Sequence, residues 1–407
     1  MFHHPDPEVL VVGAGPVGLV AALFLQQHGV RVEIIDMHQR TTQHSYALAI
    51  HPHTLKILEE VGLSETLIAA GRKLTKVAYY EGGTRRVEID YSALTSRHPY
   101  LLVVRQSMLE RAAEEALRNG KLKVLWGHRF QSLSSDGEVE VAKLDQVATG
   151  YPVARTESLV VHTETIRPRY VIGADGHDSA VRRMAHIEMD AFGAGQVLSI
   201  YEIEAAGELP GEVRVMLDTH ATSVYWPLEP GRCRFGFEIS DIRQHDTSMQ
   251  RLDQLIAAHV PWFTAKPTAI YWSTLAVFEP RLARTFGQAN VWLAGDAAHQ
   301  AAPVGVQSMN SGLFEARELA AIIARGQRAG GSTALLDRFA ADMHGVWLRL
   351  LDEGRSVGAL AGADPWVRQR AAKILPCVPA SGDELEPLLA QIGLTALPSA
   401  RSAGLGA

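Results

Sequence analysis

The chain has 407 residues, of which 47% are hydrophobic and 21% are charged. These proportions are those of an ordinary globular protein, and the length suits two or three folding units, so wholesale disorder and collagen-like repeats are excluded. The formal net charge is −6 and the basic residues form no long cluster, so no nucleic-acid partner is expected.

Cysteine and histidine usage argues against a disulfide framework or a metal site. The two cysteines, Cys233 and Cys377, have no CxxC spacing, and the 17 histidines form no HExxH motif. We therefore predict free thiols, no metal and a cytoplasmic protein. The charge-free stretch 9–25 is interrupted by glycines and preceded by acidic residues, so we predict a strand, a turn and a helix there rather than a signal peptide or a membrane span.

The first half of the chain begins with a βαβ pattern. An apolar strand is predicted over 8–12, a helix over 15–28 and a second strand over 32–35. A helix over 51–61 follows, and the composition is strand-like from about 74 to 91. Helical spacing returns over 105–117, and four further strands are predicted at 123–126, 137–142, 159–162 and 170–174.

The second half changes character twice. Residues 196–238 indicate successive strands separated by Pro/Gly turns, followed by a helix over 249–259 and a strand over 269–277. The apolar strand 291–294 returns to α/β character, the chain beyond 332 is mainly helical, and the last ten residues are expected to fray.

These elements predict an α/β fold class, in which a Rossmann-like nucleotide-binding domain is interrupted by a β-rich substrate domain and followed by a helical C-terminal region. The expected boundaries are 1–73, 101–185 and 287–354 for the nucleotide-binding domain, 74–100 and 186–286 for the β-rich domain, and 355–407 for the helical tail.

The sequence 13–18 matches GxGxxG between an apolar strand and a helix, which is the context that the motif requires. Gly13 allows the turn, Gly15 lets a pyrophosphate approach the backbone, and Gly18 lets helix and strand pack closely. Asp36 closes the second strand, where a carboxylate accepts hydrogen bonds from a ribose. The alternative is a purely structural glycine turn, which the surrounding strand, helix and acid make the weaker interpretation.

Two later segments add polar groups at strand ends. Asp175 lies in the turn 173–182 after a buried strand, where it either contacts a ligand or simply closes a strand-exit turn. Asp296 ends another apolar strand, and a carboxylate there can accept hydrogen bonds from a polyol. The segment 303–310 then opens a helix whose amides can face an anion.

In this order and spacing the three segments resemble the FAD-dependent aromatic hydroxylases, the class A flavoprotein monooxygenases similar to p-hydroxybenzoate hydroxylase. The resemblance covers about 8–355. It implies that the glycine turn holds the FAD pyrophosphate, that Asp36 holds the adenosine ribose and Asp296 the ribityl chain, and that Asp175 serves both FAD and the nicotinamide donor. It also implies cofactor contacts from Arg105, Gln106, Pro303, Gly305, Met309 and Asn310.

The resemblance further implies non-covalent FAD, NADPH or NADH as electron donor, and O2 as co-substrate. In such enzymes a C4a-hydroperoxyflavin transfers oxygen to an aromatic or polycyclic small molecule in a pocket that excludes water. A helix N-terminus beside the flavin favours the negative charge of its reduced form. No second GxGxxG provides a separate nicotinamide domain.

Two positions depart from the family pattern. Tyr46 stands where the family usually has an arginine, which puts the contact to the donor phosphates in doubt, although Arg40 is an alternative cation. In the loop beside the flavin, Val306 and Ser308 replace two glycines of Gly-Gly-Gln-Gly, and their side chains should stiffen that loop.

Other roles stay open on sequence alone. Tyr225 and Trp226 are candidates for substrate contacts in the β-rich domain, but aromatic residues of a sheet more often pack in a core. We name no catalytic base, and we expect His51 and His299 to support the backbone of their motifs. An FAD-bound reductase or halogenase and a non-catalytic flavin-binding protein are the alternative functions, and a homodimer is one alternative for the oligomeric state.

Overall fold

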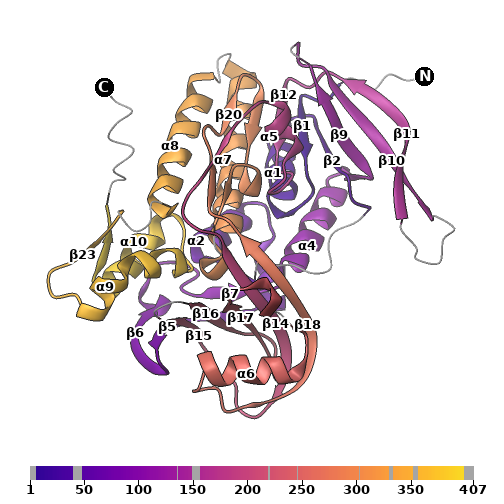
Figure 1. Cartoon of the computed structure of the whole chain (residues 1–407). Helices are drawn as coiled ribbons and strands as arrows, with labels where there is room; N and C mark the ends of the chain where they lie inside the picture. Colours follow the sequence, from indigo (N-terminus) through magenta and orange to yellow (C-terminus); the bar gives the residue numbers. More distant parts are fainter. Residues whose placement is uncertain are drawn as a thin grey trace.

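The computed structural model describes residues 6–39, 48–134, 136–148, 156–218, 221–244, 246–301, 303–329, 333–351 and 356–397. A six-stranded sheet runs through the upper part of the molecule in the order β20-β21-β12-β1-β2-β8 (Figure 1). Its strands are β1 (Val9–Val12), β2 (Val32–Asp36), β8 (Leu125–Trp126), β12 (Tyr170–Gly173), β20 (Gly287–Gln288) and β21 (Val291–Leu293). All pair in parallel except β20, which is antiparallel to β21.

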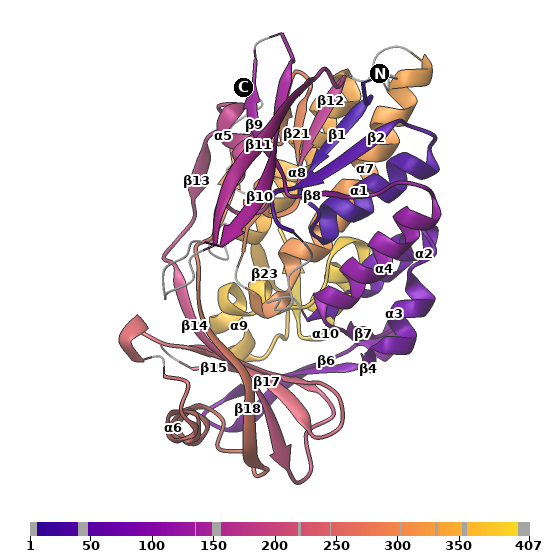
Figure 2. The ribbon, with the colours of Figure 1, turned by 90° about the vertical axis from the view of Figure 1, so that its right-hand side faces the viewer.

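Two different layers cover this sheet. Figure 2 shows helices on one side and a three-stranded antiparallel sheet on the other. The layers consist of α1 (Pro16–Gln27), α4 (Gln106–Asn119), α7 (Gln307–Ala329) and α8 (Thr333–Leu351), and of β9 (His128–Leu133), β10 (Val139–Ala148) and β11 (Thr156–Ile166). Residues 16–25 of α1 are all buried, because the helix lies between the sheet and its neighbours α4 and α7.

A seven-stranded sheet forms the lower part of the molecule (Figure 1), in the order β18-β14-β17-β16-β15-β5-β6. Neighbours are antiparallel except β15 and β5. The strands are β5 (Lys76–Glu81), β6 (Thr84–Asp90), β14 (Gln196–Ala206), β15 (Val213–Leu217), β16 (Thr222–Pro227), β17 (Arg232–Glu238) and β18 (Lys266–Phe278). Helix α6 (Met249–His259) packs on one face through Leu252, Leu255 and Ile256.

The C-terminal segment 356–397 covers the opposite face of this sheet. It consists of β23 (Val357–Ala359), α9 (Pro365–Ile374), α10 (Leu385–Gln391) and β24 (Leu394–Ala396), so it combines helices with an antiparallel strand pair. Apolar side chains of α9 and α10 share one core with Val77, Tyr79 and Val215 of the sheet. The segment therefore belongs to the packed body of the protein.

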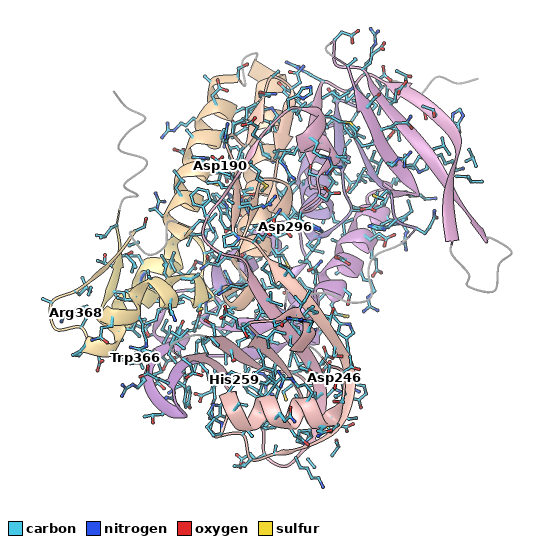
Figure 3. The ribbon with its side chains drawn as sticks, in the orientation of Figure 1. Asp190, Asp246, His259, Asp296, Trp366 and Arg368 are labelled. Atoms are coloured by element: carbon cyan, nitrogen blue, oxygen red, sulfur yellow. The ribbon has the colours of Figure 1, made fainter. Side chains whose placement is uncertain are left out.

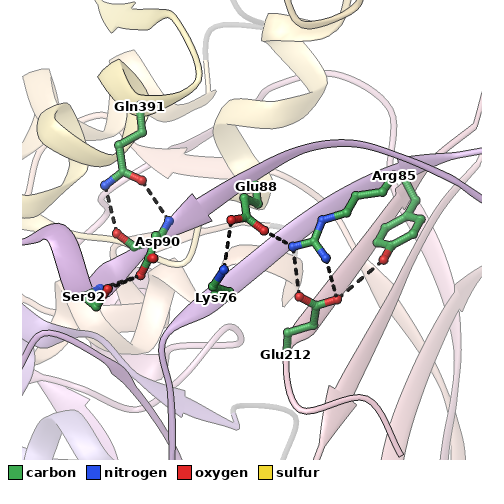
Figure 4. A network of polar contacts seen from close by, with 8 residues as sticks. Lys76, Arg85, Glu88, Asp90, Ser92, Glu212 and Gln391 are labelled. Atoms are coloured by element: carbon green, nitrogen blue, oxygen red, sulfur yellow. Dashed lines mark hydrogen bonds and ion pairs between the residues drawn. The ribbon is translucent and has the colours of Figure 1, made fainter.

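Polar contacts fix this segment to the edge of the sheet (Figure 4). The Gln391 side chain pairs with the backbone of Asp90 on β6, accepting from its N–H at 2.8 Å and donating to its carbonyl at 2.9 Å. Lys76 and Glu88 form an ion pair across β5 and β6 at 3.0 Å. Gln391 thus pairs with the backbone N–H and carbonyl of one residue of the edge strand, as a residue of a neighbouring strand would.

Smaller elements connect the two sheets. They are β3 (Ala49–Ile50), α2 (Pro52–Glu60), α3 (Ser64–Ala70), β4 (Arg72–Leu74), β7 (Leu101–Val103), α5 (Ala180–Met184), β13 (Met189–Ala191), β19 (Arg281–Ala283) and β22 (His299–Gln300). No helix in the described part of the chain is both long and apolar enough to cross a membrane.

The predicted fold class is confirmed: a parallel Rossmann-like sheet, an antiparallel β-rich sheet and a largely helical C-terminal part. The predicted helix 249–259 has those bounds in α6, whereas the hairpin strands β10 and β11 are longer than expected. Arg40, Tyr46 and the last ten residues lie outside the described residues, so the predictions made for them are not tested.

Candidate cofactor and active site

A pocket of about 620 Å³ opens where β1, β2, β12 and β21 end, at the carboxyl edge of the parallel sheet. Open α/β sheets bind their ligands at this edge. Figure 3 shows Asp296, one of the lining residues, near the middle of the molecule. Six residues predicted from the sequence line this first pocket: Gly15, Asp36, Gln106, Asp175, Asp296 and Met309.

The glycine turn between β1 and α1 has the geometry of a ligand cradle. Gly13 has a φ of +103°, and a Cβ there would lie 2.2 Å from the carbonyl oxygen of Ala174. A Cβ at Gly18 would lie 1.9 Å from the carbonyl oxygen of Gly13. Gly15 differs, because a Cβ there would meet nothing within 4 Å and would point into open space beside the pocket. Gly13 and Gly18 therefore permit close packing, and Gly15 leaves room for a ligand.

Asp36 holds the glycine turn in place while it lines the pocket. Its Oδ2 accepts the backbone N–H of Ala14 at 2.7 Å, and its Oδ1 accepts that of His38 at 2.8 Å. Each carboxylate oxygen has a further lone pair, so these bonds leave acceptor capacity for a ligand hydroxyl.

Asp175 is used mainly by its own turn. One carboxylate oxygen accepts the Ser179 hydroxyl at 2.5 Å, and the other accepts the N–H groups of Ala180 and Val181 at 2.7 and 3.1 Å. These bonds satisfy the first N–H groups of α5. Desolvation raises the pKa of the Asp175 carboxyl.

The turn that carries Asp296 is fixed from beneath by a buried carboxylate. Glu315 of α7 is fully buried and accepts the N–H of Gly295 at 2.9 Å and the indole N–H of Trp347 at 3.0 Å. The ring of His299 lies 2.9 Å from the same carboxylate and stacks on Trp347. Asp296 itself opens into the pocket, but protein surrounds it closely enough for desolvation to raise the pKa of its carboxyl.

The loop before α7 is strained at one position. Val306 has a φ of +50°, in the left-handed region that β-branched residues rarely adopt, and its side chain is buried. Its neighbour Gly305 packs so closely that a Cβ would lie 2.5 Å from the Pro376 carbonyl oxygen of the C-terminal segment. The loop therefore depends on packing from a distant part of the chain.

Asn310 and His51 clamp this loop. The Asn310 amide donates to the carbonyls of Val306 at 2.7 Å and Ala49 at 3.0 Å, and its oxygen accepts the N–H of His51 at 2.9 Å. The His51 ring contacts the Ser381 hydroxyl and the Gly305 carbonyl, each at 3.0 Å. Burial lowers the pKa of His51 to about 3, so its ring stays neutral.

Gly13 and Gly18 shape the glycine turn and do not line the first pocket. Four other predicted cofactor residues also do not line it: Arg105, Pro303, Gly305 and Asn310. Arg105 points to the seven-stranded sheet, where it forms ion pairs with Glu202 and Glu229. Met309 alone brings the 303–310 loop to the pocket lining.

Comparisons with known proteins agree with this geometry. A family model described as an FAD binding domain matches residues 6–353. The chain belongs to this family. The flavoprotein hydroxylase resemblance expected from the sequence is thereby confirmed.

Similar proteins of known name are monooxygenases. The 6-methylpretetramide 4-monooxygenase of Streptomyces rimosus is 28% identical over 366 residues, which cover 87% of this chain and 62% of that protein. The pentachlorophenol 4-monooxygenase of Sphingobium chlorophenolicum is 28% identical over 372 residues, which cover 85% and 63%. The chain thus spans less than two thirds of the length of these two relatives.

Solved structures show the same fold. The p-nitrophenol 4-monooxygenase PnpA from Pseudomonas putida DLL-E4 superposes with a TM-score of 0.74 at 23% identity, covering 95% of this chain and 96% of that chain. CabE, an aromatic hydroxylase from angucycline biosynthesis, gives a TM-score of 0.63 at 26% identity, covering 94% of this chain and 71% of that chain.

Sequence reasoning missed part of the first pocket. Residues 128–131 of β9 line it, although no motif marks them. The signal was positional: β8 pairs in parallel with β2, so the chain that leaves Trp126 must emerge at the edge where Asp36 lies. Glu110, one turn beyond Gln106 on α4, is not among the residues that line the pocket. It is buried, accepts the Gln106 amide at 2.7 Å, and burial together with the charge of Asp36 raises its pKa to about 7.

The two aromatic candidates for substrate contact point to opposite faces of the seven-stranded sheet. Tyr225 packs with Phe235 and Trp262 on the α6 side and donates its hydroxyl to the carbonyl of Pro210 at 3.1 Å. Trp226 is buried in the core shared with the C-terminal segment. Both aromatic residues therefore have packing roles, on opposite faces of the sheet.

Proposed function

We propose that this protein is an FAD-dependent monooxygenase that uses NADPH or NADH and O2 to hydroxylate or epoxidise an aromatic or polycyclic small molecule. The observation that carries the proposal is the first pocket, which brings Gly15, Asp36 and Asp296 together at the carboxyl edge of the parallel sheet. Membership of the FAD-binding family, with monooxygenases among the relatives, supports the same reaction class.

FAD fits the residues of this pocket. Gly15 leaves its backbone open to a pyrophosphate, Asp36 keeps acceptor capacity for the adenosine ribose, and Asp296 presents a carboxylate for the ribityl hydroxyls. Gln106 and Met309 also line this pocket. When bound, FAD supplies the transfer of electrons from the nicotinamide donor and the activation of O2.

The protein also provides an electrostatic contribution. Helix α7 begins at Gln307, two residues before the pocket-lining Met309, so its N-terminal end lies beside the pocket. Unpaired N–H groups at that end favour negative charge nearby, as a reduced flavin would carry. Because α7 is 23 residues long and its first turn is clamped by Asn310, this favourable field is held in a fixed position.

The substrate class is proposed from the relatives. The apolar side chains of the seven-stranded sheet opposite α6, such as Val215 and Trp226, are packed in the core shared with the C-terminal segment and leave no free surface for a substrate. The relatives are named for phenolic and polycyclic aromatic compounds, which is the class we propose here.

Oxygen uptake with the purified holoprotein tests the proposal. We expect a yellow protein whose FAD is released by acid, and NADPH or NADH oxidation that a true substrate accelerates by at least about tenfold, equivalent to roughly 1.4 kcal/mol of barrier. The screen uses phenols and polyketide-like polycycles, and mass spectrometry with ¹⁸O2 follows the oxygen into product. Donor oxidation without labelled product would favour a reductase or an oxidase, and tight FAD binding without any donor oxidation would favour a non-catalytic flavoprotein.

A further inference from the structure

A second pocket, of about 660 Å³, lies on the other side of the first turn of α4. It is bounded by the end of α3 and β4, by the chain from β7 into α4, and by two turns of the β-rich sheet. Its lining residues are Ala70, Gly71, Arg72, Val103, Val104, Arg105, Met108, Arg111, Gly207, Leu209, Leu228, Glu229, Pro230 and Gly231. None of the functions assigned above uses this space.

The charge of the second pocket is positive in a protein whose net charge is −6. Three arginines line it, against a single carboxylate, that of Glu229. Arg105 is compensated, because it pairs with both Glu202 and Glu229. Arg72 and Arg111 are the two lining arginines with no ion-pair partner in the described part of the chain, and the charge of Arg111 acts on the neighbouring Glu110.

Backbone and sulfur atoms hold these two guanidinium groups without neutralising them. The Nη1 of Arg72 donates to the Leu228 carbonyl at 3.0 Å, and the Nε of Arg111 donates to the Ser107 carbonyl at 3.1 Å. The Nη2 of Arg111 lies 3.3 Å from the Met108 sulfur. Within the described ranges no carboxylate pairs with either arginine. Guanidinium groups in this state have donors left for an anion and match the oxygens of a phosphate.

Glycines also line this second pocket. Gly207 and Gly231 have φ values of +116° and +77°, so each turn depends on a residue without a Cβ. A Cβ at Gly231 would meet nothing within 4 Å, and the backbone there faces open space. The lining thus combines apolar side chains, open backbone and two arginines that have no carboxylate partner among the described residues, which suits a ligand with both a flat apolar part and phosphates.

The second pocket adjoins the first. Gln106 lines the first pocket and the preceding residue, Arg105, lines the second, so the two are separated by the first turn of α4. A ligand with its phosphates at Arg72 and Arg111 therefore lies next to the cofactor pocket. The sequence has no second GxGxxG that would hold a nicotinamide donor elsewhere.

We propose that the second pocket binds the phosphate-bearing adenosine half of the nicotinamide donor, with Arg72 and Arg111 contacting its phosphate oxygens. This assignment rests on the proposed function for the identity of the ligand. The binding itself is independent of turnover, because it requires only the two guanidinium groups and the space between them.

Calorimetry on the FAD-loaded protein tests the assignment, with 2′,5′-ADP as the probe. We expect the double variant Arg72→Gln/Arg111→Gln to lose at least about tenfold in affinity for the probe, as expected for lost hydrogen bonds to a charged group. The native affinity should fall with added salt, and adenosine without phosphate should bind far more weakly. Arg118→Gln is the matched control, since it lies two turns further along α4, pairs with Glu114 and is outside the pocket.

Several outcomes would overturn the assignment. One is a native protein that does not bind 2′,5′-ADP, and another is a double variant of normal FAD content and melting temperature that binds it as tightly as the native protein. Benzoate is the second probe: if the double variant loses benzoate binding alone, the pocket belongs to a carboxylate. A failure of the proposed function is distinguishable, because probe binding that is lost only in the double variant supports the pocket even when no substrate stimulates donor oxidation.

Discussion

The two turns at the cofactor pocket, 13–18 and 303–310, each contain a residue with a positive φ, but different interactions stabilise the two turns. In the turn 13–18, the left-handed position is a glycine, Gly13, and the residue next to the open space is a glycine as well. In the loop 303–310, the left-handed position is occupied by Val306, whose side chain is buried. The first turn adopts its shape because side chains are absent, and the second because other segments hold it.

The supports of the second turn come from far along the chain. Asn310 and His51 hold it by hydrogen bonds. Gly305 also packs against the carbonyls of Pro376 and Val378 in the C-terminal segment, which a Cβ there would meet. A turn shaped by glycines is local and autonomous. A turn shaped by packing is coupled to the segments that pack on it, here the C-terminal segment that also covers the seven-stranded sheet.

The largest expected effect comes from filling the first turn. Gly15 has an extended backbone conformation that valine accepts, and its Cβ direction is open. Gly15→Val should therefore fold normally yet lose FAD binding by more than about a thousandfold, equivalent to roughly 4 kcal/mol. Titration of the apoprotein with FAD, followed by flavin fluorescence, measures the loss.

The control for this variant is Gly345→Val on α8, where a Cβ also meets nothing within 4 Å and which lines neither of the two pockets described above. It should bind FAD as the native protein does. A Gly15→Val protein that keeps the native affinity at an unchanged melting temperature would show that the pyrophosphate does not approach this glycine.

The two turns should also respond to pH with opposite signs. Beside the first turn, Glu110 has a pKa of about 7 in the folded protein against an ordinary 4.5. Between these values the unfolded chain has lost a proton that the folded protein keeps, so the free energy of unfolding falls as pH rises, by at most about 3 kcal/mol. Glu110→Gln should remove this loss, so that the variant exceeds the native protein in stability at pH 8 but not at pH 4.5.

Beside the second turn, His51 has a pKa of about 3 against an ordinary 6.5. Here the unfolded chain takes up the proton first, so this contribution to stability is lost as pH falls from 6.5 toward 3. Urea unfolding at several pH values separates the contributions of Glu110 and His51 to the free energy of unfolding.

The control for Glu110→Gln is Glu115→Gln, an exposed position on the same helix. If the free energy of unfolding of Glu110→Gln changed with pH as that of the native protein does, the raised pKa of Glu110 would be contradicted.

This contrast also explains what could be predicted from the sequence. The glycine turn, Asp36 and the strand ends at Asp175 and Asp296 were predictable, because each depends on residues within a few positions of one βα unit. Residues 128–131 follow from sheet order, which needs the partner of β2 to be known.

Other features depend on contacts between distant segments and leave no local pattern. Arg105 was expected at the cofactor, but the charges of Glu202 and Glu229 draw it to the neighbouring sheet. Glu315 supports the Asp296 turn from a position 20 residues from Gly295, and only the packing of α7 against that turn brings the two together. Neither contact has a spacing that a sequence motif would capture.

A smaller loss of FAD affinity than that of Gly15→Val is expected from replacing Asp296, which lines the pocket and lies between the two turns in the sequence. Asp296→Ala should weaken FAD binding by roughly 1–3 kcal/mol, as expected for lost hydrogen bonds to a charged acceptor. Asp296→Asn keeps an acceptor oxygen and should lose less. The same FAD titration measures both, and native affinity in the alanine variant would remove Asp296 from the ribityl contact.

The smallest expected effect is a reversed order of stability at the strained position of the second turn. Alanine normally stabilises a protein relative to glycine, because it restricts the unfolded chain. At a φ of +50°, however, the Cβ of alanine meets the following carbonyl at a cost of about 1–2 kcal/mol that glycine avoids. Both variants remove the buried valine side chain, so the difference between them isolates the backbone. The free energy of unfolding of Val306→Gly, measured with urea, should therefore exceed that of Val306→Ala by about 1 kcal/mol.

Val304 is the matched site, since it is buried in the same loop without a positive φ, and there the alanine variant should be the more stable. The same order at both sites would mean that Val306 is not held in the left-handed conformation.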